Sequence, residues 1–313
     1  MNRRAPRWGF DPPAAAGAAV MATGIISVGL YLTGHQIMSL SALGLDEALW
    51  LLLAAAFADK LLRDRDRWTA EAATPPALTA VAATTVLGTR LSLLGWQNVA
   101  AALLALAVLL WPGLLINVVR RGKRHMQGGV FLICVATQGL AVLSGRLAVA
   151  YRCDWLGWAA LVFFCLGLPL YVLALTRFDF RQIFTGAGDQ WVAAGALSIS
   201  AMAGSQLLAS PQWTGNGHTV LRAAALALLA LALTWYAVLL CAEVYRPRLA
   251  YDVRRWATVF PLGMTSVASL SLAGTVDIRL LERLGHVLLW IAVGAWLLTF
   301  AGLITARAGA GDL

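Results

Sequence analysis

The sequence has few charged residues and no motif for chemistry at a metal or a nucleophile. Charged side chains make up 12% of its 313 residues, against about 25% in soluble domains. The four cysteines form no CxxC pair, so neither a zinc site nor a disulfide framework is expected. The four histidines are not paired at ligand spacing, and HExxH, GxSxG and P-loop motifs are missing. We therefore expect no enzyme, no metal site and no cofactor.

In place of such motifs, the sequence has apolar runs long enough to cross a bilayer. Hydrophobic residues make up 60% of the chain, and several runs reach the roughly 18–20 residues that a span needs. This composition predicts an all-α integral membrane protein with a single membrane domain over residues 1–313. We expect ten transmembrane helices, at about 16–33, 46–62, 75–92, 98–119, 129–146, 156–175, 191–209, 219–241, 257–274 and 284–304.

The basic residues indicate how these spans are oriented. Of the 24 Lys and Arg residues, 18 fall on one side of the ten spans and 6 on the other. Because cytoplasmic loops are enriched in Lys and Arg, we expect both termini in the cytoplasm of a multi-pass protein of the cell (inner or plasma) membrane. The net charge of +9 is then a topology signal, and nucleic acid is not an expected partner.

Charged residues are also scarce inside the expected spans. Asp59, Lys60, Arg90, Arg146 and Glu243 lie at span ends, and no acidic or basic residue falls near the middle of a span. A charge at the bilayer centre usually marks a proton relay or an ion-coupled site. This scarcity argues against a pump with a buried carboxylate, although a weak acid can carry its own proton.

The odd and even spans differ in composition. The cores of the odd spans hold 17 Ser or Thr and 13 Leu residues, whereas those of the even spans hold 3 Ser or Thr and 34 Leu. Leucine-rich helices suit contact with the lipid bilayer, and helices with small and hydroxyl residues suit close packing or a wet cavity. We therefore expect five helical hairpins, with the odd helices inside around a central pore and the even helices outside.

The odd spans also share a short polar segment, which recurs about every 50 to 65 residues. Internal repeats in membrane proteins commonly build a pathway where the repeats meet. The five copies are VMATGIISV from Val20, VAATTVLG from Val81, CVATQGLAV from Cys134, LSISAMAGS from Leu197 and GMTSVASLS from Gly263.

Polar residues of these segments are the candidates for lining a pore. Hydroxyls, the two amides of Gln138 and Gln206, and exposed backbone would not repel anions, and basic residues at the rims would concentrate them. The same hydroxyls would equally serve as contacts between helices. The candidate pore-lining residues are Thr23, Gly24, Thr84, Thr137, Gln138, Ser198, Ser200 and Thr265.

Residues 254–274, RRWATVFPLGMTSVASLSLAG, are unlike the other odd spans. Phe260 is followed by Pro261 and, two residues later, by Gly263. A proline inside a helix lacks a donor and crowds the preceding turn, which predicts a kink. An ideal helix places Phe260 nearly opposite the hydroxyl stripe that contains Thr265. From the residues alone, this geometry favours a packing role for the ring.

Three segments, FDPPAAAGAAVMATGIISVGL, GDQWVAAGALSISAMAGS and RRWATVFPLGMTSVASL, resemble the tellurite-resistance/C4-dicarboxylate transporter (TDT) family. That family includes bacterial TehA proteins, yeast malate permease and plant slow anion channels, and the resemblance covers the whole chain. Residues 256–263 are similar to the family's W-x-x-x-F-P-L-G run, while Ala22 stands where many relatives have glycine. The resemblance implies one pore per subunit, a homotrimer, anion transport, and Phe260 as the ring that plugs the pore.

Two transport mechanisms stay open. The first is a passive anion channel or uniporter that is gated by Phe260 and carries small anions. The alternative is a proton-linked carrier of malate or another C4-dicarboxylate, or a tellurite-resistance transporter. A scaffold or receptor is disfavoured because the connecting loops are short.

Overall fold

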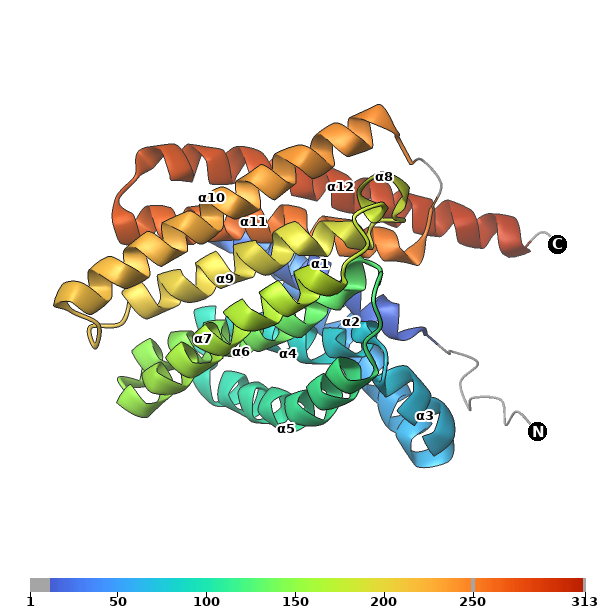
Figure 1. The fold of residues 1–313 in the computed structure, drawn as a ribbon, viewed down its shortest axis with the longest axis horizontal. Helices are drawn as coiled ribbons and strands as arrows, with labels where there is room; N and C mark the ends of the chain where they lie inside the picture. Colours follow the sequence, from blue (N-terminus) through green and yellow to red (C-terminus); the bar gives the residue numbers. More distant parts are fainter. Residues whose placement is uncertain (1–11, 249–250, 312–313) are drawn as a thin grey trace.

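The computed structural model describes residues 12–248 and 251–311, and helices dominate this part of the chain (Figure 1). Its ten long helices are α1 Gly17–Leu32, α2 Gln36–Arg63, α4 Thr79–Leu93, α5 Gln97–Arg121, α6 Leu132–Tyr151, α7 Asp154–Arg177, α9 Val192–Leu208, α10 Gly215–Tyr245, α11 Trp256–Val276 and α12 Arg279–Gly311. Two short helices are α3 Arg65–Ala72 and α8 Gln182–Thr185. The described residues form no β-strand, and one isolated bridge joins Met126 to Phe178.

A short 3-10 turn leads into every second long helix. Such turns tighten the first turn of a helix and use backbone groups that would otherwise lack partners. The five turns are η1 Ala14–Ala16 before α1, η2 Pro75–Leu78 before α4, η3 Gly128–Phe131 before α6, η4 Asp189–Trp191 before α9 and η5 Val253–Arg255 before α11. The helices that start this way are those of the five expected odd spans, so the repeat seen in the sequence has a structural counterpart.

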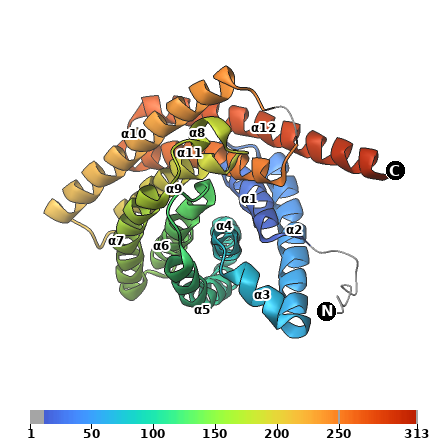
Figure 2. The ribbon, with the colours of Figure 1, turned by 45° about the vertical axis from the view of Figure 1, so that its right-hand side comes forward.

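The long helices fall into two groups by burial, and Figure 2 shows how their ribbons are arranged. In α1, α6, α9 and α11, 72–94% of the residues in an apolar 18-residue segment are buried. In α4, 13 of the 15 residues are buried. In α2, α5, α7, α10 and α12, only 11–33% of the corresponding segment is buried. We call the first group the inner helices and the second group the outer helices.

The inner helices contact one another in sequence order. α1 packs on α4, α4 on α6, α6 on α9, α9 on α11, and α11 on α1, so each inner helix touches two others. Each inner helix also packs against the long outer helix that follows it in the chain. Contacts between inner helices are close because glycines face the neighbouring helix. A Cβ on Gly139 of α6 would lie 2.3 Å from Oγ1 of Thr85 on α4.

Among the described residues, nine helices are long and apolar enough to cross a membrane. α4, which has 15 residues and carries several threonines and Arg90, is not among them. Its residues pack against other helices, so it does not need an apolar surface for lipid. A tenth crossing by η2 and α4, and a single domain over residues 1–313, stay predictions.

The helices begin and end near the expected spans, with one clear exception. The second span was expected at 46–62, but α2 begins at Gln36 and runs to Arg63. Asp46 therefore lies inside the helix, about 15 Å from its start at 1.5 Å per residue, and its exposure is 0%. Asp46 was not among the charged residues expected at span ends, and it lies within a helix that is long and apolar enough to cross a membrane.

Candidate functional site

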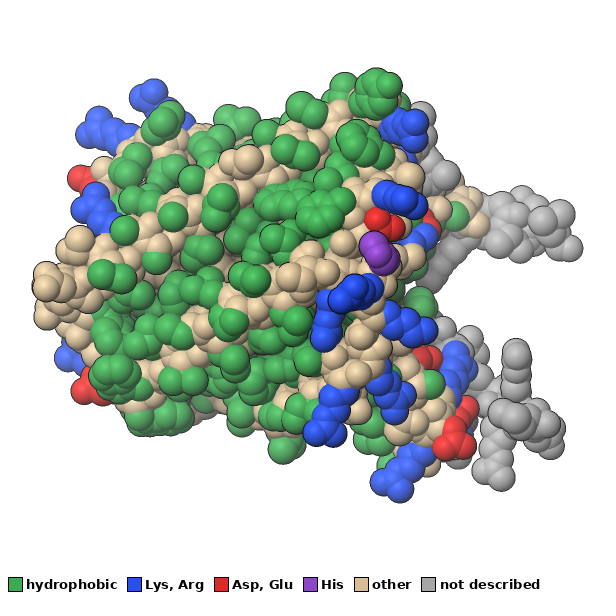
Figure 3. Space-filling view, in the orientation of Figure 1, with side chains coloured by type: hydrophobic (Ala, Val, Ile, Leu, Met, Phe, Trp, Pro, Cys, Tyr) green, Lys and Arg blue, Asp and Glu red, His purple; other side chains and the backbone are tan. Residues whose placement is uncertain are grey.

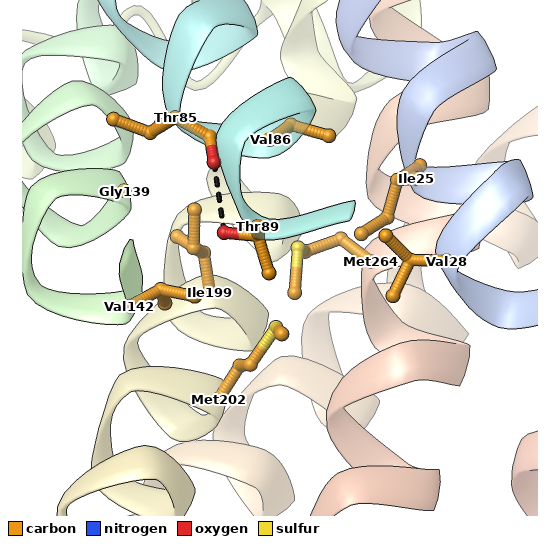
Figure 4. Close-up of a pocket in the computed structure, with 10 residues that line it drawn as sticks. All are labelled: Ile25, Val28, Thr85, Val86, Thr89, Gly139, Val142, Ile199, Met202 and Met264. Carbon is orange, nitrogen blue, oxygen red and sulfur yellow. Dashed lines mark hydrogen bonds between the residues drawn. The ribbon is translucent and has the colours of Figure 1, made fainter. Parts of the chain in front are cut away.

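The inner helices border a small cavity (Figure 4). Its volume is about 10 Å³, close to the minimum that holds one water molecule. All five inner helices contribute to its wall, and only Thr85 and Thr89 bring polar side chains to it. The lining residues are Ile25, Val28, Thr85, Val86, Thr89, Gly139, Val142, Ile199, Met202 and Met264. We call this space the axial cavity.

Four of these residues occupy the same position of the sequence repeat. Each lies two residues after the hydroxyl residue that marks a repeat. The four pairs are Thr23 and Ile25, Thr84 and Val86, Thr137 and Gly139, and Ser200 and Met202. A shift of two residues turns a side chain by about 200° around a helix, so the hydroxyl and the cavity residue face opposite directions.

The repeated threonines face the outer helices. Three tryptophan indoles donate hydrogen bonds to them, and each threonine also donates to the carbonyl four residues earlier. The indole bonds are Trp296 to Thr23 at 3.0 Å, Trp50 to Thr84 at 3.0 Å and Trp111 to Thr137 at 2.9 Å. These hydroxyls therefore join an outer helix to an inner helix.

The other candidate pore-lining residues also lie at helix contacts. Ser198 and Thr265 share a hydrogen bond of 2.8 Å between α9 and α11. Gln138 donates to the Phe164 carbonyl on α7 at 3.2 Å. Ser200 Oγ lies 3.8 Å from Cys134 Sγ on α6, and Gly24 faces α2 and α4. None of the eight candidates lines the axial cavity. For four of the ten cavity residues, the signal in the sequence is the position two residues later in the repeat.

A second, larger cavity opens at one end of the inner helices. Its volume is about 480 Å³, and we call it the vestibule. Lys and Arg side chains gather at the corresponding end of the molecule (Figure 3). The basic residues that line the vestibule are Arg121, Lys123, Arg124, His125 and Arg254. Asp189 is the acidic residue in the described lining, so the balance of charge there is positive and favours anions.

Two acidic groups moderate this charge. Arg254 donates to both carboxylate oxygens of Asp252 at 3.1 and 3.0 Å, and these bonds lower the pKa of Asp252 below its ordinary value. Asp189 accepts a bond of 3.2 Å from the backbone nitrogen of Gly129 through Oδ2. Its Oδ1 has no hydrogen-bond partner.

Phe260 lines the vestibule one helical turn before the axial cavity. Its side chain lines the vestibule and is 1% exposed, while Met264, one turn later on α11, lines the axial cavity. The same step occurs on α1, where Met21 lines the vestibule and Ile25 the axial cavity. Two bulky side chains, Phe260 and Met21, therefore stand at the inner end of the vestibule.

The residues after Phe260 fix how α11 packs. α11 continues through Pro261, and a Cβ on Gly195 of α9 would lie 2.9 Å from Cγ of Pro261. A Cβ on Gly263 would lie 2.8 Å from Cγ2 of Ile25 on α1. Both glycines thus provide room for neighbouring side chains. The proposed kink at Pro261 and Gly263 stays a prediction.

Comparison with known proteins identifies a family for this chain. Residues 12–304 match the family model named SLAC1, which is described as voltage-dependent anion channel. Two curated relatives from Mycobacterium tuberculosis, the uncharacterized membrane proteins Rv1735c (strain H37Rv) and MT1776 (strain CDC 1551), are each 33% identical over 61 residues. Each match covers 20% of this chain and 31% of the relative.

Proposed function

Because the chain belongs to the SLAC1 family of voltage-dependent anion channels, we propose that it conducts small anions through a path between its inner helices. The supporting observation is the alignment of two cavities. A basic vestibule leads to Phe260, and the axial cavity, walled by all five inner helices, follows one turn later. The five contacts between successive inner helices suit a ring around that path.

The small volume of the axial cavity suits a gated pathway. A space of about 10 Å³ holds at most one water molecule, so an anion can pass only after side chains move. Phe260 is the strongest candidate for the moving group, since its ring borders the vestibule and α11 places it one turn before Met264. We therefore assign Phe260 as the gate of a channel or uniporter.

The positions of basic residues support both an anion path through the axial cavity and the orientation of the protein in the membrane. Arg90 follows Thr89 on α4, is fully buried, and has an Nη1 without a hydrogen-bond partner. A fixed positive charge next to the cavity wall lowers the free energy of an anion inside it. The richer of the two basic ends holds the vestibule, which supports a cytoplasmic vestibule with both termini on that side.

Flux measurements on the reconstituted protein test this function. Chloride, nitrate and malate efflux from liposomes should be driven by a membrane potential, and Phe260→Ala should raise it about tenfold, as a barrier lower by about 1.4 kcal/mol would. Phe164→Ala is a matched control, because Phe164 is buried on the outer helix α7 and lines neither cavity. Equal flux in wild type and a folded Phe260→Ala protein would contradict the gate.

A proton-linked C4-dicarboxylate carrier is the second candidate. A vestibule of about 480 Å³ with several basic residues is large enough for a small dicarboxylate, and Asp46 is an acidic residue inside a span. This mechanism predicts saturable malate uptake that stops when the pH gradient is removed. Flux that follows voltage and ignores the pH gradient would exclude it. A role in tellurite resistance and a homotrimer stay predictions.

A further inference from the structure

α2 buries one narrow face although most of the helix is exposed. Its buried residues, Ser39, Leu43 and Asp46, follow one another at helical spacing. Arg90 of α4 donates to Ser39 at 2.9 Å, and Leu43 packs in a cluster with Leu87 of α4. This face of α2 therefore lies against the inner helices, and Asp46 belongs to that contact rather than to the lipid surface.

The Asp46 carboxyl has no hydrogen-bond partner. Its exposure is 0%, and neither Oδ1 nor Oδ2 bonds to another group. A Cβ on Gly24 of α1 would lie 2.7 Å from Oδ2 of Asp46 and 2.8 Å from Cγ1 of Val86 on α4. Val86 and Ile25, the residue after Gly24, both line the axial cavity. The carboxyl thus lies directly behind the wall of that cavity.

The charged groups on the elements around Asp46 form no hydrogen bond with its carboxyl oxygens. On α4, Arg90 donates to Ser27 and Ser39, and its guanidinium lies 4.6 Å from the centroid of the Tyr31 ring on α1. Ser39 precedes Asp46 by seven residues, about 10 Å along α2. Glu47 is the next residue of α2 and is half-buried. The charged residues of α3 lie beyond the other end of α2, and none of these groups bonds to Asp46. They are Arg65, Asp66, Arg67 and Glu71.

The protonation state of such a group follows from its surroundings. A buried carboxylate without a donor is several kcal/mol less favourable than the neutral acid. Acidic residues inside membrane spans mark functional sites, and proton relays are among them. Ionisation of Asp46 requires water or a donor at its oxygens, and the contact between Gly24 and Val86 can admit one by widening. That widening also enlarges the axial cavity, because Val86 and Ile25 form its wall.

We propose that Asp46 is a proton-binding site whose occupancy controls the width of the anion path. The carboxyl holds its proton while the axial cavity is closed, and it passes the proton to water when α1 and α4 separate. Anion flux then rises as the pH is raised through the range in which Asp46 ionises. The proton site depends on the contacts of Asp46 alone, whereas the control of flux rests on the proposed function.

Infrared spectroscopy of the reconstituted protein tests the proton site without measuring transport. The C=O stretch of a neutral carboxyl should be present at low pH and disappear on titration. This titrating band should be lost in Asp46→Asn and kept in Glu47→Gln, which changes the adjacent half-buried acid. Asp46→Leu is a second variant, because an apolar side chain of similar size suits a buried site. A titrating band that survives in either Asp46 variant overturns the proton site.

Anion flux measured over the same pH range tests whether Asp46 regulates the width of the anion path. Wild type and Glu47→Gln should show the same rise of anion flux with pH, and Asp46→Asn should keep the low-pH rate throughout. If anion flux in Asp46→Asn still rises with pH as in wild type, Asp46 does not regulate the flux. If the wild-type protein shows no anion flux at any pH, both the proposed function and the regulation of flux by Asp46 are overturned. The infrared band still decides whether Asp46 is a proton site.

Discussion

α6 and α7 follow one another in the chain and pack together, yet α6 is buried and α7 is largely exposed. The most apolar window of α7 has a mean hydropathy of 2.3 and is 28% buried, whereas that of α6 has 1.7 and is 94% buried. In a water-soluble protein the more apolar helix would be the more buried. In a bilayer the lipid receives the apolar helix, and the interior receives helices whose small and hydroxyl residues allow close contact. Burial in this fold therefore reflects packing and polarity rather than hydrophobicity.

Glycine substitutions give the largest expected difference between the two groups of helices. Gly139→Ala on α6 should destabilise the protein by about 1–3 kcal/mol, the usual cost of overpacking, because the new Cβ would lie 2.3 Å from Oγ1 of Thr85. Gly294→Ala on α12 meets no atom within 4 Å. It should leave stability unchanged or raise it by up to about 1 kcal/mol through helix propensity.

Thermal unfolding of both variants in the same detergent measures this difference. A large fall in the midpoint for Gly139→Ala alone would support close packing of the inner helices. Equal midpoints for the two variants would show that α6 and α4 have room to separate, and the comparison between inner and outer helices would lose its physical basis.

Much of this arrangement follows from particular features of the sequence. The excess of leucine in the even spans and of hydroxyl residues in the odd spans separated the helices that are exposed from those that are buried. This succeeded because composition averages over a whole helix. Single residues were harder to place. Thr23, Thr84 and Thr137 are polar and repeated, but their hydroxyls bond to tryptophans of outer helices.

The side of a helix that a residue faces depends on tertiary contacts, which the sequence states only indirectly. Ile25, Val86 and Met202 line the axial cavity although they are apolar, so a search for polar residues passes over them. Asp46 was missed for a similar reason. A charge normally ends a span, and only the packing of α2 against α1 and α4 shows that this charge is enclosed.

Two threonines of the inner helices sharpen the distinction between the cavity face and the outer face. Thr89 lines the axial cavity, while Thr137 accepts a hydrogen bond from Trp111. In a Phe260→Ala background, Thr89→Val should lower anion flux about fivefold, which corresponds to about 1 kcal/mol in the barrier. Thr137→Val should leave that flux unchanged. Equal effects of the two changes on efflux from liposomes would show that the path does not follow the axial cavity.

The bond between Trp111 and Thr137 gives the smallest expected effect and tests how the two groups of helices are joined. Trp111→Phe keeps an aromatic ring and removes the donor, so it should cost about 0.5–1.5 kcal/mol of stability, the net value of one hydrogen bond. Trp155→Phe is a matched control, since Trp155 of α7 is 68% exposed. If the bond matters, Trp111→Phe and Thr137→Val should be non-additive in thermal unfolding, because each removes one partner of the same bond. Additive losses would mean that packing alone holds α5 on α6, and the repeated threonines would then need another explanation.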